Sequence, residues 1–199
     1  MKNDPLEILK TKKVGIAGAG GLGSNCAVAL ARVGIGELVI ADFDTVDPGN
    51  LNRQYYFYDQ IGMKKVFALQ ENIGRINPEV KVTVHDVVLD ENNLPGIFYG
   101  CDVIVEAFDL AGMKEMIIET VQSKLPGIPL VVGLGLAGWG DNNSISTRRI
   151  GDLYICGDEK SETSGSMPPL APRVGIVSNM QANQVMEILL GTCHDNNTE

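Results

Sequence analysis

The sequence predicts an α/β fold: a Rossmann-like, mostly parallel sheet with helices on both faces, followed by a C-terminal antiparallel β-hairpin and a long helix. Three observations support this prediction. Short apolar runs alternate with segments of helical periodicity between residues 13 and 133. The first run leads into the glycines Gly18, Gly20 and Gly23. After residue 134, glycine-rich and polar segments surround two short alternating stretches.

Each element of the expected sheet has a local signal. Buried parallel strands are short apolar runs, whereas helices are longer stretches with apolar residues at helical spacing. Turn residues separate them, as at 34–37 and at Pro78, which ends a helix. The expected strands are 14–17, 38–41, 80–84, 103–107 and 129–133, and the expected helices are 22–33, 62–77 and 113–124. This alternation predicts parallel strands joined by right-handed crossovers.

The remainder of the chain predicts a different arrangement. Residues 144–150 alternate and "GDLYIC" follows a turn, which indicates a β-hairpin. A long helix is expected over 172–190. The polar segment 157–172 contains three prolines and is expected to be a mobile binding loop. Residues 1–12 are expected to form an N-terminal arm on one nucleotide-binding domain that spans 1–199.

Composition narrows the class of protein. The net charge is -9 and the pI is about 4.7, which argues against a surface for nucleic acid or acidic membrane. No apolar run approaches the roughly 20 residues that a membrane span needs, and the N-terminus lacks the apolar run of a signal peptide. These features predict a cytoplasmic protein.

The four cysteines are scattered through the chain. Cys26, Cys101, Cys156 and Cys193 form no CxxC pair, so reduced and mostly buried thiols are expected. A zinc site would need all four thiols to converge, or the two histidines, His85 and His194, to join them. No zinc site is expected.

The glycine pattern predicts a nucleotide site. Gly18, Gly20 and Gly23 fit G-x-G-x-x-G between a strand and a helix, where backbone N–H groups can approach phosphate. Asp42 ends the next strand, where a carboxylate can accept hydrogen bonds from ribose hydroxyls. The motif leaves NAD, FAD, SAM and ATP open as ligands.

The loop that follows, "DFDTVDPGNLNRQ", favours a triphosphate. The outer phosphates of a triphosphate need cations and donors beyond a glycine loop. Arg53 offers a planar fork and Lys65 a point charge, while Asn50 and Gln54 can donate hydrogen bonds. Taken singly, the two cations would fit a solvated surface pair. The set as a whole predicts ATP.

Asp109 is the candidate Mg²⁺ ligand. It closes the run "DVIVEAFD", at the carboxyl edge of the expected sheet where ligands bind in open α/β folds. A carboxylate there suits a Mg²⁺ ion that bridges phosphates. The alternative is that Asp109 only caps the helix that begins after it.

Five segments together resemble the ThiF-type family (ThiF/MoeB/HesA), the adenylyltransferases of sulfur-carrier proteins, which are related to ubiquitin-activating enzymes. They are "GAGGLGS", "DFDTVDPGNLNRQ", "IGMKKV", "RINPEV" and "PRVGIVSNMQANQVMEIL", and the resemblance covers roughly 13–191. The chain looks like the short form of the family. The resemblance implies adenylation of a carrier protein's C-terminal Gly-Gly carboxylate by ATP and Mg²⁺, with release of pyrophosphate.

The resemblance also implies residue roles. Gly20 and Gly21 would lie against the phosphates, Asp42 would bind ribose, and Asp44 belongs to the same nucleotide-binding set. Asn50, Arg53 and Gln54 would hold the phosphates, Lys65 would neutralise the transferring phosphoryl group, and Asp109 would ligate Mg²⁺. Lys114 stands where the family usually has an arginine, and Leu110 where an asparagine usually follows the metal-binding aspartate. No protein nucleophile is required, because nucleotidyl transfer is mainly positioning and charge stabilisation.

Three departures from the family pattern stand out. The two CxxC pairs of many members are missing. The N-terminal arginine that often reaches the partner subunit's ATP is absent, although Lys2, Lys10, Lys12 and Lys13 are near. The loop 157–172 holds no cysteine for a covalent link to the carrier, which leaves Cys156 at its edge as the candidate.

The resemblance implies a homodimer and a ubiquitin-like, ThiS-like sulfur carrier as partner, with thiamin biosynthesis as the setting. The carrier tail is expected to pass the segments 134–156 and 157–172, where Trp139 is either a contact residue or a core or dimer-interface aromatic. Alternatives are adenylation of another C-terminus, such as a peptide or molybdopterin-type carrier, and a non-catalytic binding module. An NAD-dependent oxidoreductase would leave Asn50, Arg53 and Lys65 without a role.

Overall fold

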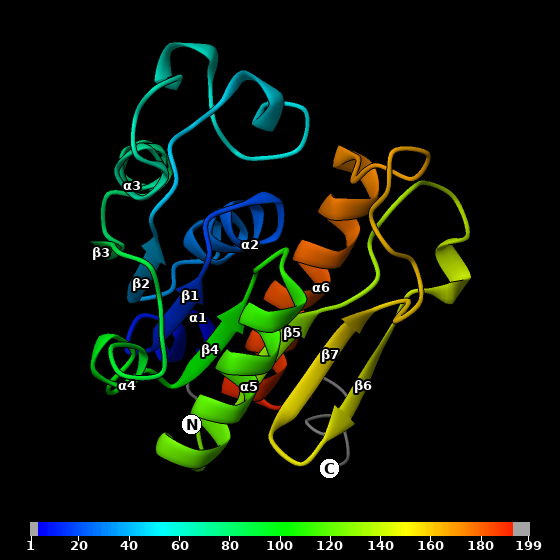
Figure 1. The fold of residues 1–199 in the computed structure, drawn as a ribbon. Helices are drawn as coiled ribbons and strands as arrows, with labels where there is room; N and C mark the ends of the chain where they lie inside the picture. Colours follow the sequence, from blue (N-terminus) through cyan, green and yellow to red (C-terminus); the bar gives the residue numbers. More distant parts are fainter. Residues whose placement is uncertain (1–3, 193–199) are drawn as a thin grey trace.

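A computed structural model describes residues 4–192, which form a seven-stranded sheet in the order β3-β2-β1-β4-β5-β7-β6 (Figure 1). Its strands are β1 (Lys13–Ala17), β2 (Glu37–Asp42), β3 (Lys81–Asp86), β4 (Val103–Glu106), β5 (Leu130–Gly133), β6 (Ser146–Ile150) and β7 (Leu153–Gly157). Neighbouring strands pair in parallel except β6 and β7, which are antiparallel. The predicted Rossmann-like sheet and hairpin are confirmed. The hairpin extends the main sheet, because β7 pairs in parallel with β5.

Helices cover both faces of this sheet. They are α1 (Pro5–Leu9), α2 (Gly21–Arg32), α3 (Lys65–Ile76), α4 (Leu94–Ile97), α5 (Ala111–Lys124) and α6 (Ala171–Leu190), with 3-10 turns η1 (Pro48–Asn50), η2 (Tyr58–Gln60) and η3 (Asn142–Ser144). Apolar side chains of α2, α3 and α6 join one core cluster, and those of α4 and α5 join another. In Figure 1, α5 lies in front of the sheet and α2 and α6 behind it.

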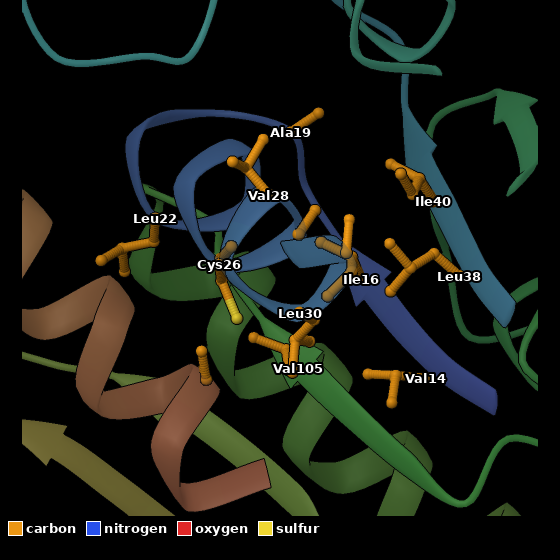
Figure 2. Close-up of a cluster of buried hydrophobic side chains, with 14 of the residues drawn as sticks. Val14, Ile16, Ala19, Leu22, Cys26, Val28, Leu30, Leu38, Ile40 and Val105 are labelled. Carbon is orange, nitrogen blue, oxygen red and sulfur yellow. The ribbon is translucent and has the colours of Figure 1, made fainter. Parts of the chain in front are cut away.

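The larger core is built on β1. Figure 2 shows Cys26 and Leu30 of α2 directed towards Ile16 of β1 and Val105 of β4, and all four side chains are fully buried. A buried parallel strand has no polar face, which explains why its sequence is a continuous apolar run. This packing fixes the beginning of α2 against the end of β1.

Two expectations about helices need correction. The helix expected over 62–77 begins at Lys65, because Gly62 has a φ of +89° and residues 61–63 form a turn. The short helix α4 was not expected, since four residues that include Pro95 give no helical periodicity. The other expected elements are present, with bounds that differ by one or two residues.

The topology fixes where a ligand would bind. The chain proceeds from β1 outward to β2 and β3, and then returns to β4 on the other side of β1. In open α/β sheets such a reversal leaves a crevice at the carboxyl ends of the two adjacent strands. The glycine loop follows β1, and Asp109 follows β4, so both stand at this crevice. None of the helices within residues 4–192 has the length and apolar character needed to cross a membrane.

Candidate functional site

The glycine loop is shaped by close backbone contacts. Gly18 has a φ of +97°, a conformation that favours glycine. A Cβ on Gly23 would lie 1.9 Å from the carbonyl oxygen of Gly18, so α2 can only pack this closely with glycine there. Gly20 precedes α2 and provides no side-chain cap, which leaves the first-turn N–H groups of the helix directed at the crevice.

Asp42 ties the glycine loop to the end of β2. Its Oδ2 accepts the N–H of Ala19 at 2.6 Å, and its Oδ1 accepts the N–H of Asp44 at 2.7 Å. Burial raises the pKa of the Asp42 carboxyl, and these two hydrogen bonds oppose the shift. Each carboxylate oxygen has a second lone pair, so ribose hydroxyls could still donate to it.

The predicted phosphate-binding loop folds onto the glycine loop. The side-chain carbons of Arg53 lie 3.6 Å and 3.8 Å from the position that a Cβ on Gly21 would take. The amide of Asn25 on α2 donates to the carbonyl of Arg53 at 2.9 Å, which fixes this contact. The guanidinium of Arg53 donates to the carbonyl of Gly49 and to the side chain of Asn52. Arg53 therefore lies beside the glycine loop, and its predicted role in binding phosphates stays a prediction.

Gln54 carries a buried polar atom that lacks a partner. Its Oε1 is buried and accepts no hydrogen bond from the described residues. Its Nε2 lies 3.9 Å from the position that a Cβ on Gly20 would take. An unpaired buried amide oxygen costs about 1–3 kcal/mol, so it fits a ligand that supplies a donor. On a nucleotide a ribose hydroxyl could supply that donor, whereas phosphate oxygens only accept and would face the N–H groups of Gln54 Nε2 beside the bare loop.

Asn50 has a structural bond within the same loop. Its side-chain oxygen accepts the N–H of Asp47, while Asp47 in turn accepts the N–H of Gly49. These bonds form the cap of η1. Asn50 therefore shapes the turn that carries Arg53, and the role predicted for it at the phosphates stays a prediction.

Tyr56 adds a contact that the sequence did not reveal. Its buried hydroxyl donates to the carbonyl of Ala19 at 2.7 Å. Burial raises its pKa well above the ordinary value, so the hydroxyl keeps its proton and remains a donor. The tyrosine thus fastens the loop to the backbone of the glycine loop.

Lys65 is a buried cation at the first position of α3. The residue is only 5% exposed, and its Nζ lies 2.6 Å from Oδ2 of Asp44. Its backbone N–H also donates to the carbonyl of Asp44. The carboxylate of Asp44, which is about half exposed, therefore holds the Lys65 ammonium at the start of the loop.

Asp109 lies at the crevice beside the glycine loop. A Cβ on Gly18 would lie 2.9 Å from the carbonyl of Ala107, which places the residues after β4 against this glycine. The cap position of α5 is Leu110, which makes no side-chain cap hydrogen bond, so Asp109 does not cap this helix. Its carboxylate is exposed, and an exposed oxygen donor there suits a hydrated Mg²⁺ ion.

Lys114 occupies a different environment from the one predicted. Its Nζ donates to both carboxylate oxygens of Glu106, at 2.8 Å and 2.9 Å, and to the carbonyl of Gly133 at 2.9 Å. An ammonium has three donors, and all three are used. Contact with a nucleotide would require breaking one of these bonds.

Glu106 is the fully buried partner of Lys114. Burial raises the pKa of its carboxyl, and the ammonium of Lys114 and the N–H of Phe108 oppose the shift. Gln181 of α6 donates to the Glu106 carbonyl. Sequence reasoning missed this network, although a glutamate inside the apolar run "VIVEAF" was a visible signal.

Cys156 is an unfavourable nucleophile in this structure. Its side chain is fully buried, and burial raises the pKa of the thiol. A thiol that stays protonated and inaccessible reacts slowly. Cys193 and His194 lie outside the described residues. Among residues 4–192 there is no group of three or more His, Cys, Asp or Glu side chains that could hold a metal ion.

The lysines of the predicted arm lie at the opposite edge of the sheet. Lys12 pairs with Asp102 and Lys13 with Glu37, at the start of β1. Lys2 lies outside the described residues. A lysine that substitutes for the missing arginine would have to act on another subunit, which stays a prediction.

Comparison with known proteins agrees with this geometry. The Yarrowia lipolytica "Adenylyltransferase and sulfurtransferase UBA4" is 32% identical over 189 residues, which are 92% of this chain and 47% of that protein. The Escherichia coli "Molybdopterin-synthase adenylyltransferase" is 28% identical over 193 residues, 94% of this chain and 77% of that protein. The chain thus spans about half the length of its UBA4 relatives.

Solved structures share the fold. The E. coli tRNA N6-threonylcarbamoyladenosine dehydratase TcdA, in complex with ATP, has a TM-score of 0.85 at 21% identity and covers 98% of this chain and 92% of its own. E. coli MccB with AMPCPP and MccA has a TM-score of 0.72 at 21% identity, over 93% of this chain and 57% of its own. The ThiF family profile matches residues 1–199. The chain belongs to the ThiF family.

Proposed function

We propose that this protein is an adenylyltransferase that uses ATP and Mg²⁺ to activate the C-terminal Gly-Gly carboxylate of a small ubiquitin-like sulfur carrier. The observation that carries the proposal is the contact between two loops. The side chain of Arg53 and the amide Nε2 of Gln54, both hydrogen-bond donors, lie beside Gly21 and Gly20, where a nucleotide would place its phosphates. The names of the relatives, which are adenylyltransferases, support the same reaction.

The reaction needs positioning and charge rather than a protein nucleophile. A carboxylate oxygen of the acceptor attacks the α-phosphorus of ATP, the bond from that phosphorus to the bridging oxygen breaks, and pyrophosphate leaves with the electron pair. Arg53 would bind phosphate oxygens through its planar fork. Lys65 would turn from Asp44 to the phosphates, because the carboxylate of this ion-pair partner is half exposed and the pair is therefore weak.

Asp109 would ligate Mg²⁺ and Asp42 the ribose. Bound Mg²⁺ supplies charge neutralisation for the departing pyrophosphate. Asp109 fits this role because it is an exposed carboxylate at the crevice and does not cap α5. Asp42 fits because it already lies against the N–H of Ala19, at the bottom of the glycine loop.

The identity of the carrier is a finer part of the proposal. We propose a ThiS-like carrier in thiamin biosynthesis, acting with a homodimeric enzyme in the cytoplasm. The free, buried thiols Cys26, Cys101 and Cys156 are consistent with a reducing compartment. A molybdopterin-type carrier is the second candidate, and the name of the 28%-identical E. coli relative favours it.

The test is ATP–pyrophosphate exchange with labelled pyrophosphate and Mg²⁺, with and without purified Gly-Gly-ended carriers of both types. Exchange that depends on one carrier supports the proposal and identifies the partner. ATP binding without exchange for any carrier would indicate a non-catalytic binding module. Tight NADH binding without ATP binding would indicate an oxidoreductase.

Two variants test the assigned roles. Arg53→Ala and Asp109→Ala should each lower the exchange rate by at least 100-fold, since each removes charge stabilisation from the reacting phosphates. Both should fold, because neither side chain belongs to the apolar core. Asp152→Ala is the matched control. Asp152 is an exposed carboxylate in the β6–β7 turn, at the end of the hairpin that lies away from the crevice. An unchanged rate in either site variant would contradict its role.

A further inference from the structure

Arg173 and Asp158 form a buried ion pair that the proposed reaction does not use. Their side chains are 5% and 8% exposed, and Nη2 of Arg173 lies 2.6 Å from Oδ2 of Asp158. Arg173 is the third residue of α6, where a cation is electrostatically unfavourable because the helix N-terminus carries partial positive charge. The position of this arginine therefore requires another reason.

Arg173 joins three segments of the chain. It donates to Asp158, to the carbonyl of Gly140 and to the hydroxyl of Ser144. Asp158 also accepts the N–H groups of Lys160 and Ser161, each at 2.8 Å. Burial opposes ionisation of Asp158, yet its hydrogen bonds with Ser161, Lys160 and Arg173 lower its pKa to about 2. The pair is charged at every physiological pH.

The segments held by Arg173 fit together through glycines. We call residues 134–140 the glycine segment and residues 158–170 the cover segment. A Cβ on Gly135 would lie 1.9 Å from Oδ1 of Asp158, and one on Gly157 would lie 1.9 Å from the carbonyl of Leu134. The carbonyl of Pro168 in the cover segment also accepts the N–H of Gly138. The "GLGLAGWG" pattern at 133–140 therefore serves this close packing.

This assembly begins at the candidate site. A Cβ on Gly133 would lie 2.3 Å from Leu22, and one on Gly21 would lie 3.0 Å from Val174, the residue after Arg173. Figure 1 shows both segments beyond the carboxyl ends of β5 and β7, beside the start of α6. The assembly therefore borders the candidate site on the side of β5 and α6.

Trp139 is the exposed aromatic of the assembly. It is 72% exposed and precedes Gly140, the residue whose carbonyl Arg173 holds. An exposed ring is compatible with a contact residue or a dimer-interface aromatic, and not with a core aromatic. A large exposed ring on a segment fixed by a buried ion pair is a rigid contact surface for an extended peptide.

We propose that Arg173 and Asp158 are positioning residues that fix the glycine segment so that Trp139 contacts the extended, Gly-Gly-ended tail of the acceptor. This inference rests on the proposed function. It predicts an effect on acceptor binding alone, because neither ion-pair residue is among those placed at the phosphates. Lysine cannot replace Arg173, because a single ammonium cannot reproduce its planar fork.

Trp139 is the only tryptophan in the chain, so its fluorescence reports directly on this segment. A synthetic peptide that ends in Gly-Gly is titrated into the full chain with ATP and Mg²⁺ present. Wild-type emission should change saturably. The peptide affinity should fall at least 10-fold in Arg173→Lys and Asp158→Asn, and ATP affinity should change less than twofold. Lys81→Met, which breaks the ion pair of a 70%-exposed side chain with Glu37 on β2, away from this assembly, is the matched control and should bind as wild type does.

Trp139→Ala keeps the test decisive if the ion-pair variants fold poorly, since its exposed ring can be removed without a cavity. Its KM for the acceptor in pyrophosphate exchange should rise at least 10-fold with kcat within threefold. Unchanged emission in the wild type, an unchanged KM in Trp139→Ala, or an equal loss of ATP affinity in the ion-pair variants would each overturn the inference. Carrier-dependent exchange by the wild type would still support the proposed function in all three cases.

Discussion

Replacing Lys114 with methionine should leave Glu106 buried beside an apolar side chain. The carboxyl would then either remain charged without its ion-pair partner or take up a proton on folding. Protonating a carboxyl of ordinary pKa, about 4.3, costs about 1.4 kcal/mol for each pH unit above that value. At pH 7 this is about 3.7 kcal/mol, within the roughly 3–5 kcal/mol expected for a broken buried ion pair.

The sign of the pH dependence follows from the pKa of Glu106. Burial raises that pKa above the ordinary value, and loss of Lys114 would raise it further. A carboxyl whose pKa is raised by folding contributes stability at low pH and loses it as the pH rises. The deficit of Lys114→Met relative to wild type should therefore shrink as the pH falls from 7 towards 5, by at most about 1.4 kcal/mol per unit.

Urea unfolding followed by circular dichroism at several pH values measures both quantities. Glu106→Gln combined with Lys114→Met should recover at least half of the loss, because the double variant buries no charge. A loss below about 1 kcal/mol with no excess pH slope would refute the reasoning. If stability were retained and ATP affinity fell 10-fold, Lys114 would instead contact the nucleotide, as the sequence suggested.

Three further predictions follow from buried contacts. Gly23→Ala should lower the free energy of unfolding in urea by about 1–3 kcal/mol or more, because its Cβ would meet the Gly18 carbonyl. Gly74→Ala, at an exposed position of α3 with open space around it, should be neutral or stabilising. Asp158→Asn should lower the free energy of unfolding by about 2 kcal/mol at pH 7, since the pKa of Asp158 falls from 3.8 to about 2 on folding. This stabilisation is complete above about pH 4 and is lost as the pH falls through 2. The stabilities of variant and wild type should therefore converge in acid unfolding. Cys156→Ala should keep at least half of the wild-type exchange rate, and the native Cys156 thiol should resist a thiol reagent until the protein unfolds; rapid native labelling would contradict its burial.

The fold was largely predictable because its signals are local. Apolar runs and the pattern of Gly18, Gly20 and Gly23 are read within short windows, and the structure has the expected strands and helices at them. The pairing of β7 with β5 was not predictable, since the segment between these strands contains no α-helix that would signal a parallel crossover. Arg53 and Gln54 lie beside the glycine loop, and their predicted role at the phosphates stays a prediction.

Lys114 shows the limit of a local signal, and Arg173 shows a buried contact that no local signal predicted. A charged residue at a fixed spacing from a motif predicts a ligand contact only if no residue of another element forms an ion pair with it. Glu106 forms an ion pair with Lys114, and Asp158 forms one with Arg173. Glu106 lies within an apolar run, and Asp158 lies in the segment after β7. The sequence signal for each pair is a polar residue inside an apolar pattern, as in "VIVEAF" and "PRVGIV".

The two buried pairs also explain why the charges left at the crevice can serve a ligand. Glu106 with Lys114 fixes the end of β4, and Arg173 with Asp158 fixes the segments after β5 and β7, so the β4 side of the crevice is held without using Asp109. Only charges that the fold does not need for itself can change partners during a reaction at small cost, since breaking a fully buried pair costs several kcal/mol. Asp109 is exposed and Lys65 is held by a half-exposed carboxylate. The roles proposed for these two groups therefore require no fully buried pair to break, whereas the role predicted for Lys114 at the nucleotide would.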